Sequence, residues 1–249
     1  MKYLFTIAIL FVMHSGFGQS VIEKAYACHD NLDYQCALDN YLIALDKKLY
    51  KEGERYLFEY HVGSCYYALK QYVKAEEYFK KALASKPNDY LSFWKLADVY
   101  FSLKKYSDAV TYYKKALDIT TIAAEKDEIN HWIGNAYYRL KDYNAAISIF
   151  KKIQSREKNL YDIDTEIGNS FLNLAKYDSA INYYKIAEKF YKSGDTAVKF
   201  VKFNMAKAYR SLGKYDQAME IQDALLKQYP TYASVIWEKG VIYVNKKDY

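Results

Sequence analysis

Proline and glycine are scarce in this sequence, with 2 and 9 among 249 residues. A β-sandwich or β-barrel needs turn residues about every ten residues, so these counts argue against both folds and favour helices. Apolar residues are not scarce: the hydrophobic share of 51% is too high for a disordered chain. The length suits one large domain or two small ones. The net charge of +6 is too small to indicate a nucleic-acid partner.

Histidine is also rare, and beyond residue 18 it occurs only as His29, His61 and His131. Acid–base or nucleophilic catalysis needs such groups to converge on one point. Cys28, His29 and Asp30 are adjacent on one predicted helix, so their side chains fan out by about 100° each and form no relay. The sequence has no C-x-x-C, no H-E-x-x-H and, beyond residue 18, no phosphate-binding glycine loop. It therefore predicts no enzyme, no metal site and no cofactor.

The three cysteines, Cys28, Cys36 and Cys65, all lie in the first third of the chain. An oxidising compartment permits a disulfide, but an odd number leaves one thiol unpaired. Cys28 and Cys36 are eight residues apart and can face each other across a helix–turn–helix, so they form a candidate disulfide. The alternative is three small buried hydrophobic residues.

The first 18 residues have the order of a secretory signal peptide. Lys2 is followed by an apolar run over residues 3–13, and then by Gly16 and Gly18 at positions −3 and −1 of a cleavage site. We expect cleavage after Gly18. The run of about 11 apolar residues is short for a membrane span, which needs roughly 20. No cysteine follows it until Cys28, which argues against a lipoprotein anchor. The mature chain is therefore expected to be periplasmic or secreted, without stable membrane insertion.

The rest of the chain is a repeat marked by a recurring tyrosine, found as Tyr34, Tyr72, Tyr106, Tyr143, Tyr177, Tyr215 and Tyr249. Three residues after each of the first six comes an alanine: Ala37, Ala75, Ala109, Ala146, Ala180 and Ala218. Four residues further on is an aromatic ring, except at Gln222. Nine residues before each tyrosine is a small residue: Ala25, Gly63, Ala97, Gly134, Gly168, Ala206 and Gly240. Steps of three and four place these residues on one helical face.

This pattern resembles the tetratricopeptide repeat, in which small residues at positions 8 and 20 let two antiparallel helices touch while rings fill the flanking space. The resemblance implies an all-α fold, a right-handed superhelix of about six helix–turn–helix repeats plus a C-terminal helix. It places the repeats at about 19–50, 56–89, 90–123, 127–160, 161–194 and 199–232, with a partial unit at 233–249. That last unit is either a capping helix or the start of a longer structure.

Proteins of this family bind extended peptides along a concave face. Carried over by register, the resemblance places on that face Tyr60, Ser64, Tyr67, Trp94, Asp98, Phe101, His131, Asn135, Tyr138, Thr165, Asn169, Leu172, Phe203, Lys207 and Arg210. Asn135 and Asn169 are suited to hold a peptide backbone by amide hydrogen bonds, and the rings to supply contact area. The alternative is that several rings only pack between repeats. The family's clamp for C-terminal carboxylates is excluded, because Thr165 and Glu238 stand where it needs other residues.

Basic pairs recur at the ends of the second helices: Lys80–Lys81, Lys114–Lys115 and Lys151–Lys152. There they complement the helix dipole, so we interpret them as a solvated face; a phosphate-binding stripe is the alternative. Taken together, the sequence predicts an extracytoplasmic scaffold that binds a protein or peptide and no nucleic acid. The alternatives are the exported sensory region of a larger signalling protein and a subunit of envelope assembly or secretion. The partner and the oligomeric state stay open.

Overall fold

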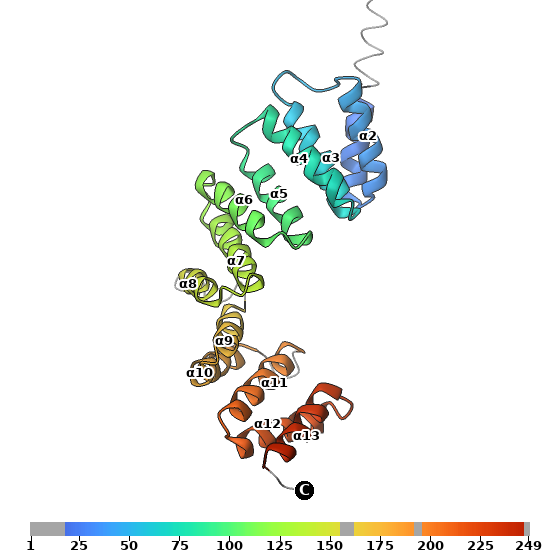
Figure 1. The fold of residues 1–249 in the computed structure, drawn as a ribbon. Helices are drawn as coiled ribbons and strands as arrows, with labels where there is room; N and C mark the ends of the chain where they lie inside the picture. The colour runs from blue at the N-terminus through green and yellow to red at the C-terminus, as the bar shows by residue number, and fades with distance from the viewer. Residues whose placement is uncertain (1–17, 155–161, 192–195, 247–249) are drawn as a thin grey trace, which may run out of the picture. The chain divides into compact units, whose positions relative to one another are not determined.

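The computed structural model describes residues 18–154, 162–191 and 196–246, and these form thirteen α-helices and no strand (Figure 1). The all-α fold predicted from the scarcity of glycine and proline is confirmed. The predicted signal peptide lies outside the described residues, except for Gly18. No helix in the described ranges is both long and apolar enough to cross a bilayer.

The chain divides into two compact units, 1–129 and 130–249, and each is described by itself. In unit 1 a helix at 18–30 precedes α2 (Tyr34–Asp46), α3 (Arg55–Ala68), α4 (Tyr72–Ser85), α5 (Tyr90–Ser102) and α6 (Tyr106–Ile119). The unit boundary falls within α7 (Ala123–Arg139). Unit 2 continues with α8 (Tyr143–Gln154), α9 (Ile163–Asn173), α10 (Tyr177–Glu188), α11 (Thr196–Ser211), α12 (Tyr215–Gln228) and α13 (Ala233–Lys246).

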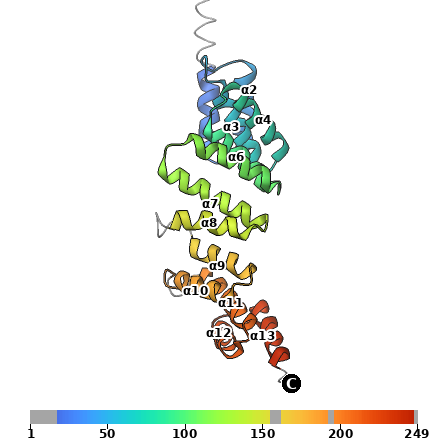
Figure 2. The same cartoon turned by 60° about the vertical axis from the view of Figure 1, so that its left-hand side comes forward.

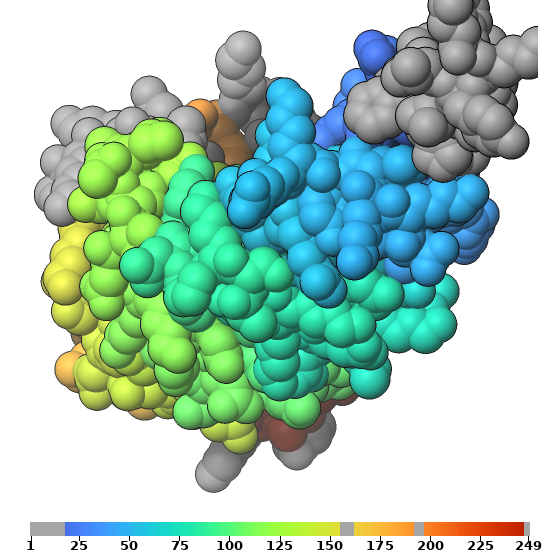
Figure 3. Space-filling model, turned by 90° about the horizontal axis from the view of Figure 1, so that it is seen from above, coloured from blue at the N-terminus to red at the C-terminus, as the bar shows by residue number. Residues whose placement is uncertain are grey.

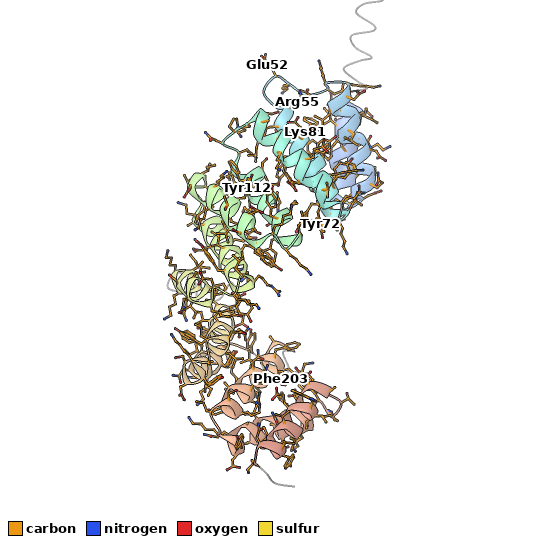
Figure 4. The ribbon with its side chains drawn as sticks, in the orientation of Figure 1. Glu52, Arg55, Tyr72, Lys81, Tyr112 and Phe203 are labelled. Carbon is orange, nitrogen blue, oxygen red and sulfur yellow. A yellow bond between two sulfur atoms is a disulfide. The ribbon has the colours of Figure 1, made fainter. Side chains whose placement is uncertain are left out.

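Within each unit, consecutive helices pair as antiparallel hairpins (Figures 1 and 2). In Figure 4, Arg55 at the start of α3 and Lys81 near the end of α4 lie at one end of their hairpin, and Tyr72 lies at the other. The space-filling view in Figure 3 shows the side chains of successive hairpins of unit 1 packed directly against one another.

The recurring tyrosine begins the second helix of each hairpin, and the residue two places before it turns the chain. These residues all have a left-handed φ: Leu32, Lys70, Lys104, Lys141, Ala175 and Gly213, at 57° to 71°. The turn at Lys70 shows how this ends the first helix, because the amide of Gln71 then donates to the carbonyl of Tyr66 at 2.8 Å. This hydrogen bond satisfies a carbonyl that would otherwise have no donor at the end of the helix. Five of the six positions carry a side chain, although glycine adopts this conformation at the lowest cost.

The small residue of the first helix meets the ring of the second helix where the two cross. A Cβ added to Gly63 would lie 2.9 Å from the ring of Phe79, and one added to Gly168 would lie 2.7 Å from the ring of Tyr184. Gly134 stands in the same relation to Phe150. All three rings are fully buried. The small residue therefore lets the two backbones approach until the ring fills the crossing point.

The recurring lysines of the second helices contact aromatic rings of the following hairpin. The Nζ atom of Lys80 lies 6.0 Å from the ring centroid of Tyr100, and that of Lys151 lies 5.8 Å from Phe171. Lys185 lies 6.0 Å from the ring of Tyr209. Such cation–π contacts stabilise the stacking of hairpins modestly. These lysines thus have a structural role in addition to facing solvent.

Cys28 and Cys36 are joined by a disulfide that links the helix at 18–30 to α2, with a Cα–Cα distance of 5.8 Å. Cys65 is unpaired and buried in α3, and burial raises the pKa of its thiol to about 12. A thiol with so high a pKa is almost entirely protonated at neutral pH and reacts slowly.

Candidate functional site

The four aromatic residues of unit 1 expected on a concave face pack largely against their neighbours. The Tyr60 ring lies 5.8 Å from Phe79. The Tyr67 hydroxyl lies 3.2 Å from the Ser102 Oγ atom, and the Phe101 ring meets Tyr106 edge-on at 5.3 Å. These rings are only partly exposed. Tyr60 and Phe101 contact rings of their own hairpins, and only the Tyr67 contact joins successive repeats.

Trp94 differs from the expectation of an accessible binding residue, because its exposed fraction is only 8%. Its position on α5 is set by the helical register, but the side chain is enclosed by the surrounding packing. Register gives the direction in which a side chain leaves its helix, and does not show whether neighbouring elements cover it. Trp94 therefore offers little surface to a ligand.

Unit 2 contains a groove between the first helices of three successive hairpins, with a volume of about 440 Å³. We call it the unit 2 groove, and it is lined by Tyr138, Asn169, Leu172, Asn173, Tyr177, Asn204, Lys207 and Ser211. Helices α7, α9 and α11 supply all of these residues except Tyr177, which begins α10. Tyr138, Asn169, Leu172 and Lys207 are among the residues expected on the concave face.

Two side-chain amides of the groove lining are held in a defined orientation. The Asn169 Oδ1 atom accepts hydrogen bonds from the buried Tyr184 hydroxyl at 2.8 Å and from Asn204 Nδ2 at 2.9 Å. In this arrangement the Asn169 nitrogen keeps its two donors. The Asn204 oxygen keeps its acceptor sites. The pair thus presents both a donor and an acceptor to a ligand.

The rest of the lining adds a hydroxyl and a cation. Asn173 Nδ2 donates to the Tyr138 hydroxyl at 3.0 Å, which leaves the hydroxyl proton of Tyr138 for a ligand. Burial raises the pKa of Tyr138, so this group keeps its proton. Lys207 lies with its Nζ atom 5.8 Å from the Phe203 ring, and within the described ranges no carboxylate forms an ion pair with it. The groove lining contains no acidic residue.

Five other residues of unit 2 expected on the concave face do not line this groove: His131, Asn135, Thr165, Phe203 and Arg210. His131 Nε2 donates to Glu166 Oε1 at 2.8 Å, and Asn135 lies 3.2 Å from the same nitrogen. Arg210 Nε donates to the buried Glu238 at 2.8 Å. The expectation of a ligand-binding Arg210 is thus replaced by a structural ion pair between α11 and α13.

The lining also includes residues that the sequence reasoning did not place on the concave face. Asn173 lies four residues after Asn169, and Ser211 lies four residues after Lys207. Positions i and i+4 share a helical face, so extending the face by one turn toward each helix end would have found both. Tyr177 had no such signal, because it begins the second helix α10, whereas the expected concave face is made of first-helix positions. Asn204 lies three residues before Lys207 on α11, and this spacing also shares a helical face.

The comparisons with known proteins agree with the observed hairpins. Tetratricopeptide repeat models match residues 56–122, 127–160 and 201–232, which together make up more than half of the chain. The chain belongs to the tetratricopeptide repeat (TPR) family. No curated protein matches the whole sequence or a part of it.

Several solved TPR structures are similar in fold. A tetratricopeptide repeat protein from Parabacteroides merdae ATCC 43184 is 18% identical, with a TM-score of 0.72 over 93% of this chain and 87% of that one. YrrB, described as a TPR protein with an unusual peptide-binding site, is 15% identical, with a TM-score of 0.65 over 79% and 98%. PilW, a type IV pilus biogenesis factor, is 17% identical, with a TM-score of 0.66 over 88% and 96%. At sequence identities this low, the similarity shows a shared fold.

Proposed function

We propose that this TPR protein is a non-catalytic scaffold, and that it binds an extended peptide segment of a partner protein in the unit 2 groove. The observation that carries the proposal is the oriented amide pair of Asn169 and Asn204. A peptide bond has one acceptor and one donor, and the pair offers the complementary donor and acceptor side by side. Peptide binding by YrrB, a protein of the same fold, supports this choice of ligand.

The charge of the groove favours a peptide with a carboxylate near the bound segment. Lys207 supplies a positive charge, and the Tyr138 hydroxyl supplies a neutral donor. Because the lining has no acidic residue, an acidic side chain of the peptide meets attraction without repulsion. Basic peptides would place a like charge next to Lys207, so they bind more weakly.

The proposal is tested with peptides selected from a random library on the purified chain. Replacing Asn169 with alanine removes the two amide donors that this residue offers to a ligand and leaves the Asn204 amide and the Tyr184 hydroxyl without their acceptor. We therefore expect affinity to fall about tenfold or more. The matched control is Asn135→Ala, an asparagine outside the groove, which should bind as the wild type does. Fluorescence anisotropy gives the affinities, and circular dichroism checks that both variants keep their helices. Equal affinities for wild type and Asn169→Ala would refute the groove assignment.

A second substitution tests the charge preference. Lys207→Gln should reduce the preference for acidic over neutral peptides and flatten the dependence of affinity on salt. It should leave neutral peptides nearly unaffected, because their binding depends on the amide pair. A variant that loses acidic and neutral peptides equally would contradict an electrostatic role for Lys207.

We also propose that the protein acts outside the cytoplasm, with residues 1–18 as its signal peptide. The Cys28–Cys36 disulfide supports this, because such bonds persist in oxidising compartments. Export predicts a native polypeptide about 2 kDa lighter than the 29.2 kDa sequence, with Cys65 as its single free thiol after denaturation. Intact mass before and after thiol labelling measures both. An uncleaved chain with three free thiols would contradict export.

A further inference from the structure

Phe200 is an exposed aromatic side chain on the face of α11 that lines the unit 2 groove. The spacings from Phe200 to Asn204, on to Lys207 and on to Ser211 are four, three and four residues. These spacings place all four side chains within an arc of about 60° on the helix. The last three line the groove, and 55% of the Phe200 side chain is exposed. The groove face of α11 therefore continues, toward the start of the helix, onto an uncovered ring.

Two further rings extend this surface. Phe203, which Figure 4 labels on α11, has its ring centroid 5.6 Å from that of Tyr232 in the connection between α12 and α13. Both side chains are partly exposed. We call Phe200, Phe203 and Tyr232 the α11 aromatic patch. A single exposed ring needs no explanation, but three neighbouring rings beside a groove form a surface suited to a ligand.

Lys199 connects the rings of the α11 aromatic patch. Its Nζ atom lies 5.2 Å from the ring centroid of Phe200, 4.7 Å from that of Tyr232 and 5.2 Å from that of Tyr229. In the part of the chain that the structure describes, no carboxylate forms an ion pair with this lysine. The ammonium group therefore holds the rings together by cation–π contacts and places a positive charge beside them. A basic side chain of a ligand would meet a like charge here, whereas an aromatic one would not.

We propose that the peptide bound in the unit 2 groove continues along α11 and places an aromatic side chain on the ring of Phe200. This inference rests on the proposed peptide-binding function and specifies the peptide further. The aromatic residue lies three positions from the acidic residue that pairs with Lys207. An aromatic side chain fits because stacked rings gain more than their buried area alone provides, and because such a side chain loses few rotamers on binding.

The spacing of three residues follows from the geometry of α11. Phe200 and Lys207 are seven residues apart, which is about 10 Å along the helix axis. In a polyproline II segment, residues three positions apart point to the same side and lie about 9 Å apart. Such a segment has no internal hydrogen bonds, so its peptide groups can pair with the amide of Asn204, which lies between Phe200 and Lys207 on α11. The match holds for either direction of the peptide chain.

Fluorescence anisotropy with synthetic peptides of otherwise equal sequence tests the proposal. Two peptides carry a phenylalanine three residues before or after a glutamate, a third has a spacing of two, and a fourth replaces the phenylalanine with alanine. The better of the first two should bind the wild type about tenfold more tightly than the alanine peptide, and more tightly than the peptide with the shorter spacing. Phe200→Ala should abolish this advantage and leave the alanine peptide unaffected. Phe200→Tyr keeps the ring and should preserve the advantage.

Two further variants separate this inference from the proposed function. Ile186→Ala removes an apolar side chain that is 40% exposed on the face of α10 opposite its buried residues, and should change no affinity. Asn169→Ala should weaken all four peptides alike, because its amide contacts the peptide backbone. If the phenylalanine gives no advantage, or keeps its advantage in Phe200→Ala, the aromatic subsite is overturned while the effect of Asn169→Ala still supports the groove. If Asn169→Ala binds every peptide as the wild type does, or the wild type binds none, the proposed function and this inference both fail.

Discussion

Tyr184→Ala should lower the free energy of unfolding by about 3–5 kcal/mol. The Tyr184 side chain is fully buried, and its ring fills the crossing of α9 and α10 over Gly168. Removing the ring leaves a cavity that Gly168, which has no side chain, cannot fill. The substitution also leaves the Asn169 oxygen without its hydroxyl donor. Urea unfolding followed by circular dichroism measures the loss as a lower midpoint.

Two further variants separate the contributions of Tyr184. Tyr184→Phe keeps the ring and loses only the hydrogen bond to Asn169, so it should cost about 1 kcal/mol. It should nevertheless weaken peptide binding, because the Asn169 amide is then held by Asn204 alone. Phe200→Ala removes an exposed ring of the same unit and should change stability by less than about 0.5 kcal/mol. If Tyr184→Ala unfolds at the same urea concentration as Phe200→Ala, the crossing ring is not what stabilises the hairpin.

Acidification from neutral pH to about pH 4 should destabilise unit 1 through His61. Burial and the nearby His29 lower the pKa of His61 to about 4, whereas an imidazole in an unfolded chain has a pKa near 6.5. The His61 ring stacks on Tyr41 with centroids 4.9 Å apart. Between these two pKa values the unfolded chain binds a proton that the folded chain does not. The unfolding free energy therefore falls as the pH decreases through this range, by about 3 kcal/mol in total.

His61→Phe isolates this effect, because it keeps a ring on Tyr41 and removes the titrating group. Carboxylates also titrate toward pH 4, so the informative quantity is the difference between the pH dependences of wild type and variant. Urea midpoints measured at steps from pH 7.5 to pH 4 should show a steeper decline for the wild type. Below about pH 4, where both states of the wild type bind the proton, the two curves should run parallel. Parallel curves over the whole range would show that His61 titrates normally in the fold.

The hairpins could be predicted because their signals are local. A tyrosine, an alanine three residues later and a ring four residues after that define the packed face of the second helix. The small residue nine places earlier defines the crossing point on the first helix. Every hairpin of the described residues uses the same turn before its tyrosine. The repeated residue pattern of the hairpins can therefore be recognised in the sequence without any knowledge of three-dimensional contacts.

The candidate site was predictable only in part. Helical register gives the direction in which a side chain leaves its helix, but it does not give the residues that the side chain contacts. Asn169 and Tyr138 do line the unit 2 groove. Arg210 occupies an equivalent face, yet it is paired with Glu238, which lies 28 residues away in sequence. Trp94 also follows the register and is nevertheless enclosed.

The sequence by itself determined the all-α class, the repeat and the pairing of small residues with rings, since each depends on spacings within one hairpin. The tertiary structure alone decided which polar groups remain available to a ligand. Asn169 meets Asn204, and Tyr138 meets Asn173, over separations of 35 residues. Such partners belong to neighbouring hairpins, and whether they meet depends on how those hairpins stack. The physical reason is that a hydrogen bond needs its two atoms within about 3 Å, a condition that no spacing along one helix can specify.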